Sequence, residues 1–436
     1  MPAPRMTAPT RRRPLLFYGW YIAIAGAATN FIVGGIVNFG FGVFIDPIRE
    51  ELGWSLTLLT IGFSLRSFQS GLLAPVTGLV VDRVGPRRMS VLGIVVVAAG
   101  LVVMAAAHHL VTFYAASLLM ALGQSMGGFT AYSAAIVRWF NRKRGRAMGA
   151  IAAGNGFGYL FAPPLAVLIA TVGWRATLVV AAAFVLTLGI PLALVIRDRP
   201  ERYGLAPDGD VAHELPDDHR QLAEHASDQN ADSSVGEALR APAFYLLLLA
   251  TTFSIPTQNA FITFQVPHLH AVGYSLTAAA FLAAGYGLVQ GPMRFIGGTV
   301  ADRFGRRRMY VASFLLQGVG LVIFASMTPS RPYLIPLFYA TYATGHALFA
   351  ALFMTMTADY FGTRRFASLQ GLVMSAQMPL GIAVPILTGI VFDRTGSYAH
   401  MWVVFAVMTS MGALWVSLVR RSPLAAPART AEARAR

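Results

Sequence analysis

The residue with the clearest chemical consequence is Arg294, a guanidinium placed inside an apolar stretch of the chain. It lies eight residues before Asp302, which is roughly 12 Å along a helix and deep for a side chain that must reach water. The acidic residues of the sequence stand at the ends of the apolar stretches, in loops or in tails. Because a guanidinium presents paired donors that match two carboxylate oxygens, Arg294 predicts a binding site for an acid that comes and goes.

Other polar side chains accompany this arginine on apolar helices. Gln290 and Tyr286 precede it at four-residue intervals and therefore share its helix stripe. We predict a substrate site from residues of this kind, which are Arg294, Gln290, Tyr286, Tyr132, Tyr342, His346 and Asn38. Simple packing is the alternative for the aromatic members. His346 either titrates near neutral pH or forms a hydrogen bond between helices.

Arg66 is a second basic residue inside an apolar stretch. It lies sixteen residues before Asp82 and on a stripe with Gln69. Three interpretations stay open, namely a gate, a second contact for the anion, and a structural arginine bonded to backbone carbonyls.

The elements that position these residues are membrane helices. Hydrophobic residues make up 56% of the 436 residues and charged residues only 12%, a composition typical of membrane proteins. A spanning helix needs about 20 apolar residues. Twelve such stretches are visible, at 17–45, 55–80, 89–107, 111–137, 147–170, 175–196, 242–267, 275–300, 309–328, 332–357, 366–390 and 399–419. The first is too long for a signal-peptide core, so we expect it to be retained.

Basic residues predict the orientation in the membrane. The net charge of +15 comes from Lys and Arg concentrated in the tails and in alternate loops. The positive-inside rule then places both termini in the cytoplasm. Attraction to anionic lipid accounts for these clusters, and the sequence lacks the interleaved aromatic residues expected of a nucleic-acid-binding face. The sequence has no cysteine, which excludes disulfides and thiolate metal sites.

A polar segment and an internal repeat divide the chain in two. Residues 197–241 are rich in Asp, Glu, Pro and His, a composition typical of a solvated linker. The stretch GLVVDRVGPRR before this linker recurs after it as GTVADRFGRRR. We therefore expect an all-α membrane protein with two pseudo-symmetric six-helix bundles: a cytoplasmic tail at 1–16, bundles at 17–196 and 242–420, the cytoplasmic linker at 197–241 and a cytoplasmic tail at 421–436.

The repeated loop carries charged residues that we predict to form a conformational latch. These are Asp82, Arg83 and Arg87 in the first copy and Asp302, Arg303 and Arg307 in the second. Carboxylates at helix ends bind arginines and exposed backbone donors, and such contacts break and reform when bundles move. The alternative is that the basic loops only set the topology.

The repeated G-x-x-x-D-R-x-G loop and the six-plus-six layout resemble the major facilitator superfamily. This resemblance implies two bundles related by an axis along the membrane normal, a site near mid-membrane and rocking of one bundle against the other. The first stretch, with its FYGW start and later FGVF, and the position of Arg294 resemble the monocarboxylate porter branch. In that branch the matching arginine binds the substrate carboxylate, and Tyr132 and Tyr342 match its site tyrosines by position.

The sequence departs from the branch at positions tied to proton coupling. Animal members have a lysine where this chain has Phe39 and an aspartate where it has Gln290. Neighbouring oxalate/formate exchangers have a lysine in the eleventh helix, where this chain has Gln377 and no charge. A single binding cation favours a monocarboxylate over a dicarboxylate.

We therefore predict a secondary active transporter of small monocarboxylates such as lactate or pyruvate, located in the cell inner membrane. Charge balance favours proton symport, because an anion entering alone opposes an inside-negative potential of about 2.3 kcal/mol per charge per 100 mV. The alternatives are an organic-anion exchanger of the oxalate/formate type, an efflux carrier and a non-transporting sensor. We expect a monomer without cofactor or metal, and no enzyme, since no metal cluster or nucleophile–base set lies inside the helices.

Overall fold

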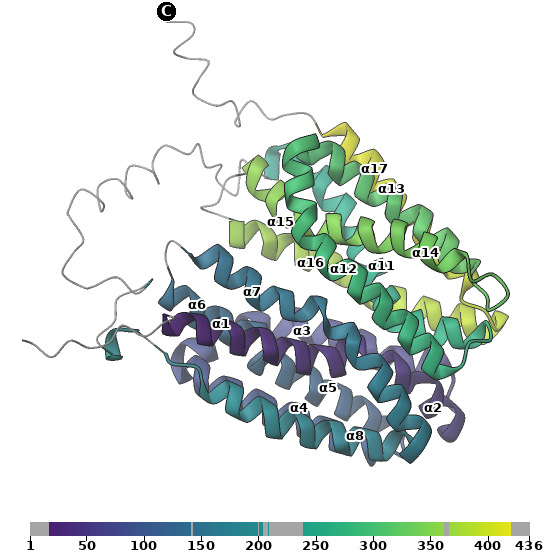
Figure 1. Ribbon diagram of the computed structural model, residues 1–436, viewed down its shortest axis with the longest axis horizontal. Coiled ribbons are helices and arrows are strands. Elements are labelled where there is room, and N and C mark those ends of the chain that lie inside the picture. The colour runs from purple at the N-terminus through teal and green to yellow at the C-terminus, as the bar shows by residue number, and fades with distance from the viewer. Residues whose placement is uncertain are drawn as a thin grey trace, which may run out of the picture.

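The computed structural model describes residues 17–140, 143–198, 200–203, 208, 239–361 and 366–419. The predicted tails and most of the predicted linker lie outside these residues, so their boundaries stay predictions. The described elements are helical, and Figure 1 shows them in two groups, one from α1 to α8 and one from α11 to α17. An all-helical architecture is thus confirmed.

The first group contains the elements α1 (Tyr18–Thr29), the π-helix η1 (Asn30–Phe39), α2 (Gly42–Leu52), α3 (Leu56–Val84), α4 (Pro86–Ala105), α5 (Leu110–Gly127), α6 (Phe129–Trp139), α7 (Arg144–Gly156), the 3-10 helix η2 (Gly158–Phe161) and α8 (Ala162–Leu194), followed by η3 (Pro200–Tyr203). The second contains α11 (Pro242–Ala271), α12 (Leu276–Phe304), α13 (Arg306–Ala325), α14 (Leu334–Phe338), the π-helix η5 (Tyr339–Ala343), α15 (Thr344–Phe361), α16 (Phe366–Thr395) and α17 (Ala399–Leu418).

The sequence repeat corresponds to a repeat in how helices begin and end. Ser55 caps α3 by accepting from the Leu58 amide at 3.3 Å, and Ser275 caps α12 by accepting from the Ala278 amide at 3.1 Å. Both helices end at a glycine of the repeated loop. Gly85 has φ 93° and Gly305 has φ 94°, a backbone region that residues with a Cβ rarely adopt.

Several predicted stretches are interrupted or shifted in the structure. The stretch predicted at 111–137 breaks at Gly128, where α5 ends and α6 begins. The stretch at 17–45 continues to Leu52 through the π-helix η1. Gly173, with φ 80°, kinks α8 between the two stretches predicted at 147–170 and 175–196. The break at Gly128 follows from backbone geometry rather than from hydropathy, so the apolar pattern did not reveal it, whereas the kink at Gly173 coincides with the gap between two predicted stretches.

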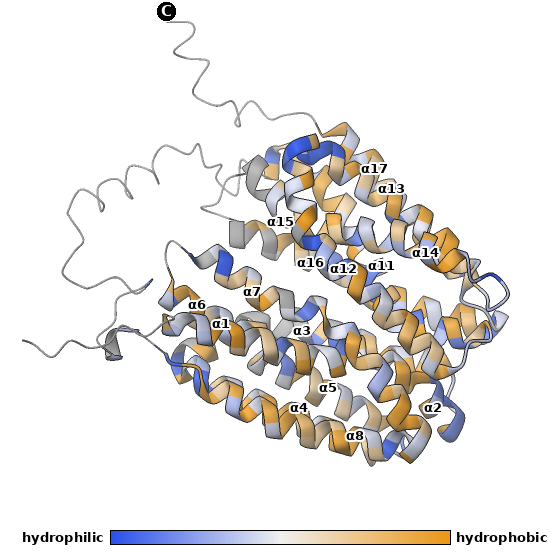
Figure 2. Ribbon diagram, in the orientation of Figure 1, coloured by the Kyte–Doolittle hydropathy of each residue, from blue (hydrophilic) through white to orange (hydrophobic). Residues whose placement is uncertain are grey.

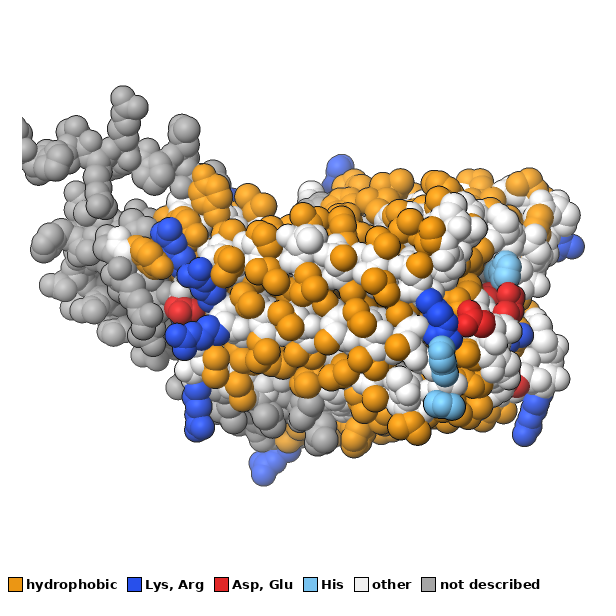
Figure 3. Space-filling model, turned by 90° about the horizontal axis from the view of Figure 1, so that it is seen from below, with side chains coloured by type: hydrophobic (Ala, Val, Ile, Leu, Met, Phe, Trp, Pro, Cys, Tyr) orange, Lys and Arg blue, Asp and Glu red, His pale blue; other side chains and the backbone are white. Residues whose placement is uncertain are grey.

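The protein is a multi-pass membrane protein. Within the described residues, seven helical segments are long and apolar enough to cross a bilayer: Tyr18–Leu52, Pro86–Ala105, Leu110–Trp139, Gly145–Leu194, Arg306–Ala325, Gly371–Thr395 and Ala399–Leu418. The number twelve stays a prediction. Hydrophobic residues run along the helices of both groups (Figure 2), and the face in Figure 3 has a hydrophobic middle with charged side chains gathered at its ends.

The two groups of helices pack against each other through a few elements. Contacts between them join α3 to α16, α2 to α11, and α12 to both α8 and η2. For reference, we call the end that carries Asp46 and Asp393 the Asp46 end, and the end that carries Arg83 and Arg303 the Arg83 end. The helix α12 runs from the Asp46 end to the Arg83 end and contacts α7, η2 and α8 of the first group.

Candidate functional site

Arg294 lies on α12 beside a cavity between the two groups of helices. The cavity has a volume of about 190 Å³ and is lined by Gly149, Ala152, Gly156, Phe157, Gly291, Arg294, Ala350 and Ala351. A water molecule occupies roughly 30 Å³ in the liquid, so there is room for a small organic acid. The side chains around the guanidinium are small or apolar. Nη1 of Arg294 lies beside Gly156, 3.9 Å from the point that a Cβ atom would occupy there. The cavity wall therefore comes from α7, α12 and α15 together.

Among the described residues, no carboxylate forms an ion pair with the guanidinium of Arg294. Its Nε is buried and has no hydrogen-bond partner among the described residues. The ion pairs described for this chain involve Asp46, Glu51 and Asp302, all away from Arg294. A buried cation without a counter-ion is costly in an apolar medium. The arrangement is therefore suited to an anion that enters the cavity, as the sequence predicts.

The stripe predicted on α12 is formed, and it meets α15. The Tyr286 hydroxyl forms a hydrogen bond with Nδ1 of His346. The Tyr286 ring lies 5.8 Å from the Tyr342 ring, measured between centroids. Gln290 is fully buried, and both its amide oxygen and its amide nitrogen lack partners among the described residues. The Tyr342 hydroxyl is likewise buried and unpartnered there. The structure thus brings Tyr286, Tyr342 and His346 together, and Gln290 lies one turn after Tyr286 on the same helix, between Tyr286 and Arg294.

A further tyrosine reaches this cluster from the other group of helices. Tyr159 lies in η2, its ring packs edge-on against Tyr286 with centroids 5.0 Å apart, and its buried hydroxyl has no partner among the described residues. Phe39 at the end of η1 also packs against Tyr159, with the rings tilted by 49° and their centroids 4.5 Å apart. The sequence analysis did not select Tyr159. The glycine-rich run GNGFGY at 154–159, which ends α7 and begins η2, was the available signal.

Two predicted site residues lie elsewhere. The Tyr132 hydroxyl forms a 2.7 Å hydrogen bond with Thr29 Oγ1, inside an apolar cluster between α1 and α6. Asn38 accepts a hydrogen bond at 3.1 Å from Nη2 of Arg66, which also donates to the Val37 carbonyl oxygen at 3.3 Å. Of the three interpretations of Arg66, the bonding to helix carbonyls is the one that the described contacts support. The roles of Tyr132 and Asn38 in binding substrate stay predictions.

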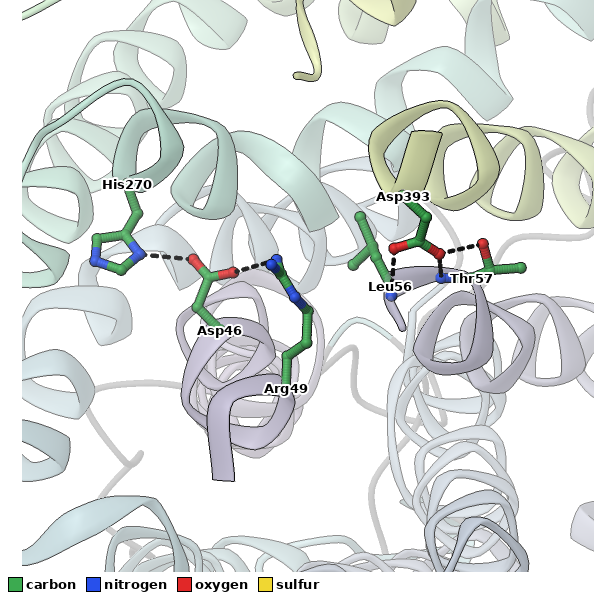
Figure 4. A network of polar contacts seen from close by, with 6 residues as sticks. All are labelled: Asp46, Arg49, Leu56, Thr57, His270 and Asp393. Atoms are coloured by element: carbon green, nitrogen blue, oxygen red, sulfur yellow. Dashed lines mark hydrogen bonds and ion pairs between the residues drawn. The ribbon is translucent and has the colours of Figure 1, made fainter. Parts of the chain in front are cut away.

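The Asp46 end is closed by an ionic contact between the groups (Figure 4). Nδ1 of His270 on α11 lies 2.8 Å from Oδ2 of Asp46 on α2. Arg49 Nη1 is 3.7 Å from the other Asp46 oxygen, and its guanidinium lies 4.9 Å from the centre of the Phe392 ring. The hydrogen bond to Asp46 raises the pKa of His270, which lies beyond the predicted 242–267 span, and burial opposes this rise. The proton on His270 therefore favours contact between α2 and α11.

A second contact at this end involves the start of α3 (Figure 4). The Asp393 carboxylate on α16 accepts hydrogen bonds from the amides of Leu56 and Thr57, each at 2.9 Å, and from the Thr57 hydroxyl at 2.5 Å. The first amides of a helix have no partner within the helix and lie at the positive end of its dipole. A carboxylate from one group thus caps a helix of the other.

The predicted latch residues lie at the Arg83 end, where the described contacts stay within one group. Asp302 forms an ion pair with Arg306, with 2.8 Å between Oδ1 and Nε. Arg307 donates to the carbonyl oxygens of Val416 and Ser417 near the end of α17. Arg83, Arg87 and Arg303 are exposed, and the side chain of Asp82 lies outside the described residues. The latch function stays a prediction.

Metal chemistry finds no support in the part of the chain that the structure describes. Those residues hold no group of three or more His, Cys, Asp or Glu side chains able to bind a metal ion.

Comparison with known proteins identifies the family of this chain. Residues 27–272 and 246–436 match the Major Facilitator Superfamily. The oxalate:formate antiporter of Oxalobacter formigenes is 26% identical, over 84% of this chain and 84% of that protein. Monocarboxylate transporter 12 of Rattus norvegicus is 24% identical, over 87% and 81%. Among solved structures, an inward-facing, occupied bacterial homologue of the human lysosomal transporter Spinster superposes with a TM-score of 0.71 at 17% identity, over 92% of this chain and 96% of that one.

Proposed function

Because the chain belongs to the Major Facilitator Superfamily, we propose that it is a secondary active transporter of small monocarboxylates such as lactate and pyruvate. One observation carries this proposal. Arg294 is a cation inside the helical body, it borders a cavity of about 190 Å³, and its Nε has no partner among the described residues. A carboxylate supplies the paired oxygens that a guanidinium binds best.

The surroundings of Arg294 favour an acid with one carboxylate. The second intramembrane arginine, Arg66, already donates to Val37 and Asn38, so one guanidinium remains for an anion. The buried Tyr342 hydroxyl, which has no partner among the described residues, is a further donor in the cluster around Tyr286. The relatives named for monocarboxylates and for oxalate and formate support an organic acid as the substrate class.

The closed Asp46 end supports alternating access. In the proposed topology both termini are cytoplasmic and the protein lies in the cell inner membrane, so the Asp46 end faces outward. Asp46–His270 and Asp393–Thr57 then close the outer side, while the cavity beside Arg294 lies nearer the Arg83 end. Rocking of one bundle against the other would break these contacts and expose Arg294 to the outside.

Proton symport is the form of coupling we propose. An anion that entered alone would move against the membrane potential by about 2.3 kcal/mol per 100 mV. The animal pattern of a lysine and an aspartate is replaced by Phe39 and Gln290. The candidate proton carrier is therefore the pair of substrate and Arg294, since His346 is buried and forms the hydrogen bond between helices that is the alternative to titration. We further propose that the protein acts as a monomer.

Uptake into proteoliposomes tests this function. Protein reconstituted without internal substrate should accumulate labelled lactate when the outside is acidic, and Arg294→Ala should abolish that accumulation. Uptake that needs internal oxalate or formate would instead identify an exchanger. Insensitivity to every carboxylate would indicate an efflux carrier, and ligand binding without flux would indicate a sensor. A thermal-shift screen of small carboxylates on purified protein measures binding independently of flux.

A further inference from the structure

The cavity beside Arg294 offers a bound molecule one charged partner and an otherwise apolar wall. Apart from Arg294, the described residues that line it are glycines and alanines of α7, α12 and α15, together with Phe157 directly after α7. None of these side chains can donate or accept a hydrogen bond. The lining is therefore suited to a molecule with one carboxylate and an apolar remainder.

The two ends of the cavity differ in exposure. Gly156 and Gly291 are buried, and Nη1 of Arg294 lies beside Gly156. Gly149 and Ala152, which precede Gly156 on α7, are exposed. Seven residues of helix separate Gly149 from Gly156, which corresponds to roughly 10 Å. A carboxylate on Arg294 thus lies at the buried end, and the rest of the acid extends along α7 toward Gly149.

We propose that this site prefers unsubstituted aliphatic monocarboxylates, such as butanoate and pentanoate, over 2-hydroxy and 2-oxo acids of the same length. This inference rests on the proposed function, because Arg294 must hold the carboxylate. Methylene groups gain free energy when the apolar wall covers them. Lactate and pyruvate are then substrates of lower affinity.

A polar group next to the carboxylate is the feature that the wall disfavours. The second carbon of the acid lies beside Gly156, Gly291 and Phe157 at the buried end. A hydroxyl or carbonyl at that carbon gives up hydrogen bonds to water, and no side chain of the described lining replaces them. A second carboxylate is disfavoured more strongly, because a buried charge needs a partner of opposite sign.

Two glycines of α7 provide a matched pair of variants. Nothing lies within 4 Å of the point that a Cβ atom would occupy at Gly149, so a leucine fits there and takes up the space of the apolar tail. Gly145 lies one turn earlier, is exposed, has equally open surroundings and does not line the cavity. Gly149→Leu and Gly145→Leu therefore make the same substitution inside and outside the proposed tail site.

Thermal-shift titrations of the purified full-length protein measure the apparent Kd of each acid. The unsubstituted series is acetate, propanoate, butanoate and pentanoate, and each added methylene should lower Kd by up to about fourfold, the factor for a fully buried CH₂. The comparison acids for butanoate are 2-hydroxybutanoate, 2-oxobutanoate and succinate. Butanoate should bind at least about fivefold more tightly than each of them.

The variants locate the apolar tail. In Gly149→Leu the gain in affinity from propanoate to pentanoate should disappear, whereas Gly145→Leu should keep it. In Arg294→Met the dependence on chain length should be lost together with binding. A dependence that persists in Arg294→Met would overturn the inference, because the methylenes would then be binding to detergent or to another apolar surface.

The remaining outcomes separate this inference from the proposed function. Butanoate that binds no better than its hydroxy and oxo derivatives would overturn the inference while the transport of monocarboxylates stands. A chain-length gain that survives in Gly149→Leu would overturn the placement of the tail along α7. Folded wild-type protein that binds none of the acids, lactate and pyruvate included, would overturn both proposals. If Gly149→Leu does not fold, the wild-type affinities still decide the preference.

Discussion

Replacing Arg294 by methionine should weaken substrate binding without harming the substrate-free protein. Nε of Arg294 is buried and unpartnered among the described residues, and no carboxylate there forms an ion pair with it. Removing one member of a buried, hydrogen-bonded charge pair costs about 2–5 kcal/mol, which corresponds to a loss of roughly 30-fold to several-thousand-fold in affinity. Arg294→Lys keeps the charge but loses the fork of donors, and should lose about 10- to 100-fold.

Stability in the absence of substrate is the more discriminating measurement. A cation at membrane depth costs about 2.5–3.5 kcal/mol on insertion scales, so the methionine variant should melt at the same temperature as the wild type or higher. Lactate at a hundred times its Kd should stabilise the wild type by about 2.7 kcal/mol and should not shift the variant. Thermal unfolding in detergent, with and without lactate, measures both effects.

Two results would refute the reasoning about Arg294. A substrate-free variant that melts several degrees lower would mean that the guanidinium has a structural partner. A variant that keeps the lactate-induced shift would mean that the carboxylate binds elsewhere. Arg66→Met is the control. It should lower the melting temperature of the substrate-free protein, because Arg66 donates hydrogen bonds to Val37 and Asn38.

Further predictions concern Arg66 and the Asp46 end. Arg66→Met should lower the unfolding free energy by about 1–3 kcal/mol because it leaves buried acceptors unpaired, as chemical denaturation would show. Asp393→Asn should weaken the cap on α3 and expose Arg294 to the outside more often. The chain has no cysteine, so the labelling rate of a single cysteine introduced near Arg294 measures this exposure. An unchanged labelling rate would contradict the prediction. Because Asp46 raises the pKa of His270, closure of this end should be complete below the ordinary histidine pKa of about 6.5 and be lost as the pH rises through the raised value. His270→Gln should remove that pH dependence of labelling, and a titration that persists in the variant would assign it to another group.

Much of the helical framework could be predicted because it depends on local pattern. Each predicted apolar stretch coincides with helical elements, and the repeated loops end α3 and α12 at Gly85 and Gly305 as their composition indicates. The break at Gly128 could not be predicted, because glycine within an apolar run is compatible with a continuous helix. The kink at Gly173 lies in the gap between the stretches predicted at 147–170 and 175–196, so the sequence already separates these two helical segments.

The candidate site could be predicted only in part. Arg294, Gln290 and Tyr286 follow from their spacing on one helix. Tyr159 and its contact with Tyr286 depend on how η2 packs on α12, and no sequence period carries that information.

The sequence by itself determined the class of protein, its helical stretches, and a cation with no anion of its own at the same depth. Hydropathy and helix periodicity encode these features, because they depend on residues within a few turns of each other. Only the tertiary structure decided that Arg66 binds Asn38, that Tyr132 binds Thr29, and that Asp393 caps α3. The helices are apolar on most sides, so their sequences do not say which faces meet. That choice is made by packing and by the pairing of buried polar groups across the whole chain.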